Sequence, residues 1–166
     1  MINLPMINID INIVEKSWRM ENPKIRKNIK SLFEKIVPQT KLSAYLKQNI
    51  SLVISLLLTN DKQIRQLNCD YRKQNKATNV LSFPLWEKEM PKKTILLGDI
   101  ILSYETIKKE ALEQNKIFLH HLSHLLIHSL LHLIGYDHII KKDAAIMERL
   151  EIKLLKTLNI NNPYII

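Results

Sequence analysis

Residues 117–138 read IFLHHLSHLLIHSLLHLIGYDH, and the apolar part of this stretch decides the fold. From Ile117 to Ile134 apolar residues recur without a long polar interruption, which predicts a strongly apolar helix. Gly135 follows at the position where helices commonly end in a left-handed residue. Because a helix that is apolar around most of its surface is covered by other elements, we expect it at the centre of the domain.

The sequence on both sides of this helix carries the patterns of strands and of further helices. From Met6 to Val14 isoleucines alternate with polar residues, which predicts a half-buried strand. Residues 50–58 are almost entirely apolar and predict a strand buried on both faces. Two more strands are predicted at 79–85, where Pro84 indicates an edge or a bend, and at 96–102. Helices are predicted over residues 24–37, 60 or 61 to about 71, 104–115 and 142–158.

Two of these helices have candidate N-caps. Asn60 or Asp61 can cap the first of them, with Ile64 facing inward, and Ser103 can cap the second. No repeat or Gly/Ser-rich linker divides the chain, so we expect a single domain over residues 1–166. The element order predicts an α/β (α+β) fold, in which a mixed sheet of about four strands packs with about five helices and the His-rich helix is central.

The composition is that of a globular protein with a strong positive charge. Of the 166 residues 46% are hydrophobic and 25% are charged, and the formal net charge is +9. Such a balance favours a polyanionic partner, nucleic acid before membrane, although a compositional bias toward lysine explains much of the charge equally well. The single Cys69 excludes an intrachain disulfide framework and suits a reducing compartment.

The apolar segments predict no membrane association, and we expect a cytoplasmic location. The N-terminal stretch MINLPMINIDINIV has no basic region and carries Asp10 within its apolar part, unlike a secretory signal. The most apolar run, LVISLLL at 52–58, is far too short to cross a bilayer.

Three histidines of the opening stretch have the spacing of metal ligands. His128 and His132 are four residues apart on the predicted helix and share one face. Gly135 permits a positive φ, so the chain can reverse and return His138 to the same point. Three imidazoles leave the fourth tetrahedral position open, which is typical of a catalytic zinc, one Zn²⁺ per chain. Copper and nickel bind the same ligands, so the metal itself stays open.

The other histidines are not expected to be metal ligands, and the residue after His128 bears on the kind of metalloenzyme. All six histidines lie between residues 120 and 138. We expect the remaining ones, His120, His121 and His124, to be solvated or hydrogen-bonded in the core. A fourth imidazole from His124 would close the open position. Certain metallopeptidases share the H-x-x-x-H-x-x-G-x-x-H pattern but need Glu after the first His, and Ser129 stands there, which disfavours a peptidase.

Four stretches resemble motifs of one family, the YbeY endoribonucleases, also called rRNA maturation factors. They are HSLLHLIGYDH at 128–138, LNCDYRKQNKATNVLSFP at 67–84, LLGDIILS at 96–103 and NNPYII at 161–166. The resemblance covers about residues 50–165. It implies a zinc-dependent, single-strand-specific endoribonuclease that acts in maturation of the 16S rRNA 3′ end and in ribosome quality control.

The resemblance also implies roles for individual residues. His128, His132 and His138 match the family's zinc ligands, and Arg72 matches an arginine that the family needs for RNA cleavage. We therefore take Arg72 and His128 as the catalytic residues. Asp99 matches an acidic residue linked to ribosomal-protein binding. The implied partners are single-stranded rRNA and the small ribosomal subunit with its proteins.

The chain departs from the family pattern at three positions. Ser129 replaces a usual Gly, and because serine is small we expect close helix packing to survive. Asn75 stands where Asp is common and Ala77 replaces a Pro. We expect these two changes to loosen the loop that carries Arg72.

The side chains themselves suggest further roles and alternatives. The planar Arg72 guanidinium can grip two phosphate oxygens, but an arginine at a helix end is also favoured by the helix dipole. Asp99 and Asp137 are candidates for orienting a ligand imidazole, and a local turn contact explains Asp137 equally well. Tyr136 is expected to pack. Thr78, Asn79 and Ser82 are candidates for contacts to RNA.

Several properties stay open at this point. The nucleophile is either zinc-activated water or the RNA 2′-OH, and the general base, the cleavage site and the oligomeric state are undetermined. Two alternatives to the nuclease remain. One is a non-catalytic ribosome-assembly factor with a structural zinc site, and the other is the disfavoured metallopeptidase.

Overall fold

A four-stranded mixed sheet underlies the fold in the computed structural model, which describes residues 6–86 and 93–165. The sheet order is β1-β2-β4-β3. Three strands are parallel, and β3 runs antiparallel to β4 at the edge, with Pro84 as its last residue. The predicted mixed sheet and the edge position of Pro84 are confirmed. The strands are β1 (Ile7–Ile13), β2 (Ser51–Thr59), β3 (Val80–Pro84) and β4 (Thr94–Ser103).

The five predicted helices are all present, together with two short helices that were not predicted. Both α1 and α3 have five residues, too few to show a helical repeat in sequence. Among the described residues no helix is long and apolar enough to cross a membrane. The helices are α1 (Ser17–Glu21), α2 (Ile25–Ile36), a 3-10 turn (Val37–Gln39), α3 (Ser43–Lys47), α4 (Asp61–Arg72), α5 (Tyr104–Glu113), α6 (Phe118–Leu133) and α7 (Lys141–Thr157). The ends of two sequence motifs, residues 1–5 of the N-terminal stretch and Ile166, lie outside the described residues.

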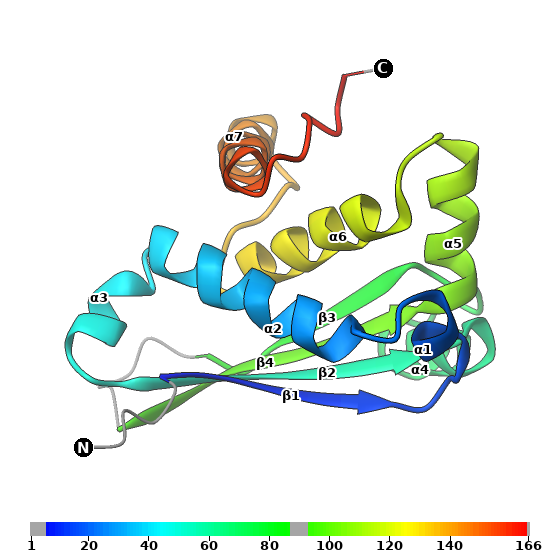
Figure 1. Ribbon diagram of the computed structural model, residues 1–166, viewed down its shortest axis with the longest axis horizontal. Coiled ribbons are helices and arrows are strands. Elements are labelled where there is room, and N and C mark those ends of the chain that lie inside the picture. Colours follow the sequence, from blue (N-terminus) through cyan, green and yellow to red (C-terminus); the bar gives the residue numbers. More distant parts are fainter. Residues whose placement is uncertain (1–5, 87–92, 166) are drawn as a thin grey trace.

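The main core lies between the sheet and α6. Helices α2 and α6 cover one face of the sheet, and α7 crosses the outer side of α6 (Figure 1). Alternate residues of β2, from Leu52 to Leu58, are buried beneath them. Because α6 has the sheet on one side and α7 on the other, ten of its sixteen residues are buried, and its predicted central position is confirmed.

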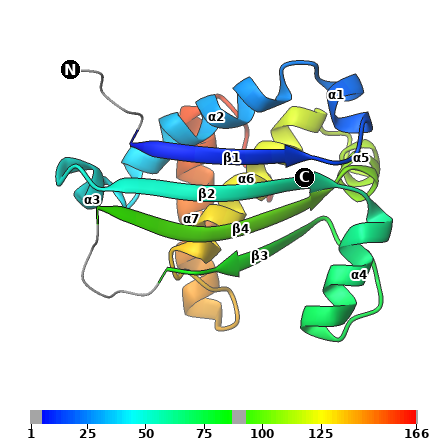
Figure 2. The same cartoon turned by 90° about the horizontal axis from the view of Figure 1, so that it is seen from below.

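Within residues 6–86 and 93–165, the opposite face of the sheet is covered at one end, by α4 (Figure 2). Ile64 of α4 packs there on Leu81 and Ile101. The prediction that residues 50–58 are buried on both faces is therefore wrong. The outward side chains of β2, such as Ser55 and Leu57, are only half-buried, although Leu57 packs against the cluster that contains Ile64 of α4.

The two candidate caps have different outcomes. Of the two residues predicted for the cap of α4, Asn60 forms it, since its Oδ1 accepts a hydrogen bond from the backbone N–H of Gln63 at 2.9 Å. Ser103 occupies the N-cap position of α5 but makes no side-chain cap bond. Its buried hydroxyl donates to Oδ1 of Asp61 at 2.6 Å, because the first turn of α4 packs against it.

Candidate metal centre

The three predicted histidines converge at the C-terminal end of α6. The Nε2 atoms of His128 and His132 are 3.1 Å apart. His138 comes from the loop after the helix, and one ring nitrogen from each of the three residues lies within 4.8 Å of the others. Two nitrogens bound about 2.0–2.1 Å from a tetrahedral zinc would be separated by about 3.4 Å. The geometry of the α6 pair therefore fits a metal ion.

Gly135 makes this convergence possible. Its φ of +99° is a conformation that residues with a Cβ rarely adopt. The N–H of Gly135 bonds to the carbonyl of His132, and the N–H of Tyr136 bonds to that of Leu131, so the helix closes there. The chain then reverses, as predicted, and returns His138 toward α6.

Each helical histidine has its second ring nitrogen in a hydrogen bond. Nδ1 of His132 lies 3.1 Å from the carbonyl oxygen of Tyr136, to which it can donate. Nδ1 of His128 contacts Oε1 of Glu151. A proton held on each Nδ1 leaves Nε2 with a free lone pair, which is the form of imidazole that binds a metal.

The pKa of His132 also favours the neutral imidazole. Burial lowers this pKa, and the nearby rings of His128 and His138 lower it further when they are protonated. The hydrogen bond to the Tyr136 carbonyl and the charge of Asp137 oppose these effects without cancelling them. Because metal binding requires the unprotonated ring, the surroundings of His132 suit a ligand.

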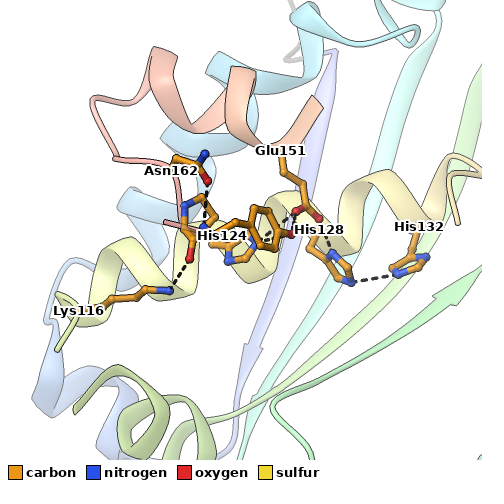
Figure 3. Close-up of polar contacts among 8 residues, drawn as sticks. Lys116, His124, His128, His132, Glu151 and Asn162 are labelled. Carbon is orange, nitrogen blue, oxygen red and sulfur yellow. Dashed lines mark hydrogen bonds and ion pairs between the residues drawn. The ribbon is translucent and has the colours of Figure 1, made fainter. Parts of the chain in front are cut away.

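Glu151 is a completely buried carboxylate beside this cluster. Figure 3 shows Glu151 reaching His128 from the helix above, with His124 one turn away on α6. Burial raises the pKa of Glu151, but hydrogen bonds from His124, His128 and Tyr164 outweigh it and lower the pKa to about 2. Glu151 therefore carries a negative charge next to the proposed ligands.

The histidines open into a cleft of about 720 Å³ that also contains the other predicted site residues. Arg72 lines it as the last residue of α4, so the guanidinium has both the helix-end position and access to a ligand in the cleft. Lys73 follows with a left-handed φ of 58° and ends the helix there. The cleft is also lined by Thr78, Asn79 and Ser82, from β3 and the loop before it.

Of the remaining predicted residues, His124 and Tyr136 also line the cleft, whereas His120 and His121 do not. Nε2 of His124 is 3.2 Å from Glu151 at the rim of the cluster. His121 is buried and bonds to Glu110 at 2.7 Å, while half-buried His120 lines a separate groove beside α2. Tyr136 packs against the main core, as expected, with Nζ of Lys41 4.7 Å from its ring centre.

Neither predicted aspartate bonds to a ligand imidazole among the described residues. Asp137 accepts a hydrogen bond from the backbone N–H of His138 at 2.6 Å, which is the local turn contact. Asp99 is paired with Ser55 and Phe83 in the sheet, and it is not among the residues that line the cleft. The carboxylate that bonds to His128 is Glu151 instead.

The sequence interpretation missed Glu151, although its position carries a signal. The buried residues of α7 are Met147, Glu151, Leu154 and Leu155, which recur at helical spacing on one face. A glutamate within such an apolar face is unusual, because burying an unpaired carboxylate is strongly unfavourable. That pattern could have identified Glu151 as a residue with a buried polar partner.

The three positions that depart from the family pattern have different local contacts. Ser129 is fully buried, and its Oγ has no hydrogen-bond partner among the described residues. Asn75 accepts a hydrogen bond from Nε of Arg65 at 2.9 Å, and half-buried Ala77 packs against the core beneath α4. Nδ2 of Asn68 donates to the carbonyl of Lys76 at 2.9 Å. The loop after Arg72 is therefore joined to α4 by hydrogen bonds at Asn75 and Lys76, and its expected loosening relative to the family pattern stays a prediction.

Comparisons with known proteins agree with these features. The family model Endoribonuclease YbeY matches residues 14–159. Proteins named Endoribonuclease YbeY are similar to this chain in Bartonella quintana (strain Toulouse), with 41% identity over 96% of this chain and 98% of that protein, and in Ehrlichia canis (strain Jake), with 40% identity over 95% and 97%. The solution structure of TM1509 from Thermotoga maritima shares 25% identity and a TM-score of 0.54, covering 91% of both chains. The family model spans both the histidine motif and the segment with Arg72, so the chain belongs to the YbeY endoribonuclease family.

Proposed function

We propose that the chain is a zinc-dependent endoribonuclease that cleaves single-stranded RNA at the cleft beside α6. The observation that carries the proposal is the convergence of three imidazoles in a cleft that Arg72 also lines. Zinc is the metal proposed because neutral imidazoles suit it and three of them leave a position open for substrate or water. A divalent metal held by His128, His132 and His138 supplies Lewis acidity for phosphodiester cleavage.

The protein side chains have separate tasks in this proposal. Arg72 binds the non-bridging oxygens of the scissile phosphate, and its charge opposes the negative charge that develops there. Thr78, Asn79 and Ser82, which line the same cleft, offer hydrogen bonds to the ribose and base groups. The net charge of +9 attracts the RNA backbone to the protein.

The proposed cellular role is maturation of the 16S rRNA 3′ end and ribosome quality control in the cytoplasm. Asp99 is proposed to contact a protein of the small ribosomal subunit. Its place on the sheet supports this, because Asp99 is half-buried on the face that α4 leaves partly uncovered. Asp99 is not among the residues that line the RNA cleft, so the two proposed contacts involve different residues.

Cleavage of a single-stranded RNA in the presence and absence of a chelator tests the proposal. The purified wild-type protein should cleave the RNA, lose activity with the chelator and regain it when Zn²⁺ is restored. His128→Ala should be inactive under all conditions, whereas His120→Ala, outside the cleft, should behave like the wild type. Cleavage that is insensitive to the chelator and unchanged in His128→Ala would contradict the proposal.

The same experiment addresses the two alternatives. An assembly factor with a structural zinc would bind the small subunit without cleaving RNA, and His132→Ala would leave that binding intact. A metallopeptidase would hydrolyse an unstructured peptide library. The structure disfavours the peptidase, because Ser129 holds the position of the required general base and is fully buried.

A further inference from the structure

Glu151 lies where a carboxylate is costly unless it is well bonded. Its side chain is 1% exposed, and its neighbours on the same face of α7 are Met147, Leu154 and Leu155. Among the described residues it has no lysine or arginine partner, and all its hydrogen bonds come from His124, His128 and Tyr164. Each of these donors lines the cleft. The buried charge is therefore directed at the cleft and not at the packing of α7.

The two oxygens of Glu151 have different partners. Oε1 contacts Nδ1 of His128, whereas Oε2 contacts Nε2 of His124 and the hydroxyl of Tyr164. Because bonds on Oε2 fix the plane of the carboxylate, they also fix the direction from which Oε1 meets His128. The His128 ring is thereby held with Nε2 facing Nε2 of His132.

Tyr164 reaches Glu151 because the C-terminal tail folds back over α6. Asn159, with a φ of 58°, turns the chain after α7, and the N–H of Ile160 bonds to the carbonyl of Leu155. Nζ of Lys116 then donates to the carbonyl of Pro163 at 3.3 Å (Figure 3). The Tyr164 ring lies edge-on to His124 with 5.5 Å between the ring centres. The tail is thus attached to the body of the protein at several points.

We propose that Glu151 and Tyr164 are positioning residues of the metal centre, so that the C-terminal tail is part of that centre. Glu151 orients His128 for the metal, and Tyr164 orients Glu151. The inference rests on the metal site of the proposed function. Outer carboxylate partners of ligand histidines contribute 10- to 100-fold to metal affinity in other proteins.

Two variants test this directly. Glu151→Gln should weaken Zn²⁺ binding by about 10- to 100-fold. Tyr164→Phe should weaken it less, because His124 still bonds to Oε2. The matched controls are Glu148→Gln, which removes an exposed carboxylate from the same helix, and Tyr45→Phe, which removes a hydroxyl outside the cleft. Both controls should bind Zn²⁺ like the wild type.

Three measurements separate positioning from general stability. Zn²⁺ affinity is measured by competition with a chromophoric chelator, ligand geometry by the visible spectrum of the Co²⁺-substituted protein, and folding by thermal unfolding of the metal-free protein. The expected result is lower affinity with an altered Co²⁺ spectrum in both variants. Tyr164 is 44% exposed, so Tyr164→Phe should stay folded if Glu151→Gln does not.

The outcomes distinguish the two levels of the proposal. A wild-type protein that binds neither Zn²⁺ nor Co²⁺ would overturn the proposed function. A wild-type protein that binds both, with Tyr164→Phe and folded Glu151→Gln indistinguishable from it in affinity and spectrum, would overturn only the positioning role. Lower thermal stability with an unchanged Co²⁺ spectrum would assign both residues to packing alone and would also overturn it.

Discussion

Arg72 and the histidines face one cleft but belong to different parts of the chemistry. The imidazoles of His128 and His132 are fixed by hydrogen bonds on Nδ1, whereas the guanidinium of Arg72 extends from an exposed helix end. A side chain that binds phosphate can therefore be removed without disturbing the metal ligands. This separation makes single substitutions informative.

Arg72→Ala should lower kcat/KM for RNA cleavage by about 10²- to 10³-fold, the loss typical when one charge-stabilising donor is removed from an active site. Arg72→Lys should retain part of the activity, because a lysine keeps the charge but not the paired donors. Zn²⁺ affinity should be unchanged in both. The control Lys62→Ala removes an exposed positive charge elsewhere on α4. An equal loss in Lys62→Ala would indicate general RNA attraction and not a specific role for Arg72.

Glu151 gives the metal-free protein a predictable sensitivity to acid. Its pKa is lowered in the folded protein to about 2, against an ordinary value of 4.5. A lowered pKa means that the contribution to stability is complete above about pH 4.5 and is lost as the pH falls toward 2. The shift corresponds to a contribution on the order of 3 kcal/mol.

Urea unfolding of the metal-free protein between pH 5 and pH 3 checks this expectation. The free energy of unfolding should fall less steeply with pH in Glu151→Gln than in the wild type, because the substituted side chain cannot be protonated. Glu148→Gln should keep the wild-type slope. Identical slopes in all three proteins would show that the buried carboxylate does not govern the acid response.

The beginnings of α4 and α5 show what can be predicted for single elements. The cap at Asn60 depends only on a side chain and a backbone N–H three residues later, so the sequence could narrow it to Asn60 or Asp61. The hydroxyl of Ser103 could bond either within its own helix or to Asp61. It bonds to Asp61 because α4 and α5 pack together, which the sequence does not reveal. The prediction that β2 is buried on both faces was wrong for a similar reason. Burial of the outward face depends on how α4 packs on the sheet, which the sequence of β2 does not show.

Asn60→Ala should destabilise the protein by about 1 kcal/mol, the usual effect of losing an N-cap side chain. The loss should be somewhat larger than for an isolated cap, since Nδ2 of Asn60 also lies 3.3 Å from a carboxylate oxygen of Glu15. Chemical unfolding at neutral pH measures the difference. Lys62→Ala, at an exposed position of the same first turn, serves as control, and an equal change in both variants would exclude a capping effect.

Across the whole molecule, the predictable part of the site is the part encoded locally. His128, His132, Gly135 and His138 lie within one short segment, where helical spacing and a glycine turn suffice to bring the ligands together. The prediction that Arg72 belongs to the site came from the family resemblance. Nothing in the sequence around Arg72 shows that α4 ends near α6. Glu151 and Tyr164 escaped prediction because their contacts depend on how α7 crosses α6 and how the tail returns.

Metal binding is expected to stabilise the whole fold. A metal that binds only the folded protein stabilises it by about 2.7 kcal/mol when its free concentration is one hundred times Kd. For a chain of this size that corresponds to a rise in Tm of roughly 5–11 °C. Differential scanning calorimetry with and without Zn²⁺ should show this rise for the wild type. Because His138 is exposed, His138→Ala should keep the metal-free Tm but lose most of the rise, whereas His120→Ala should retain it. A full rise in His138→Ala would mean that the loop after Gly135 does not contribute a ligand, and the three-histidine centre would be wrong.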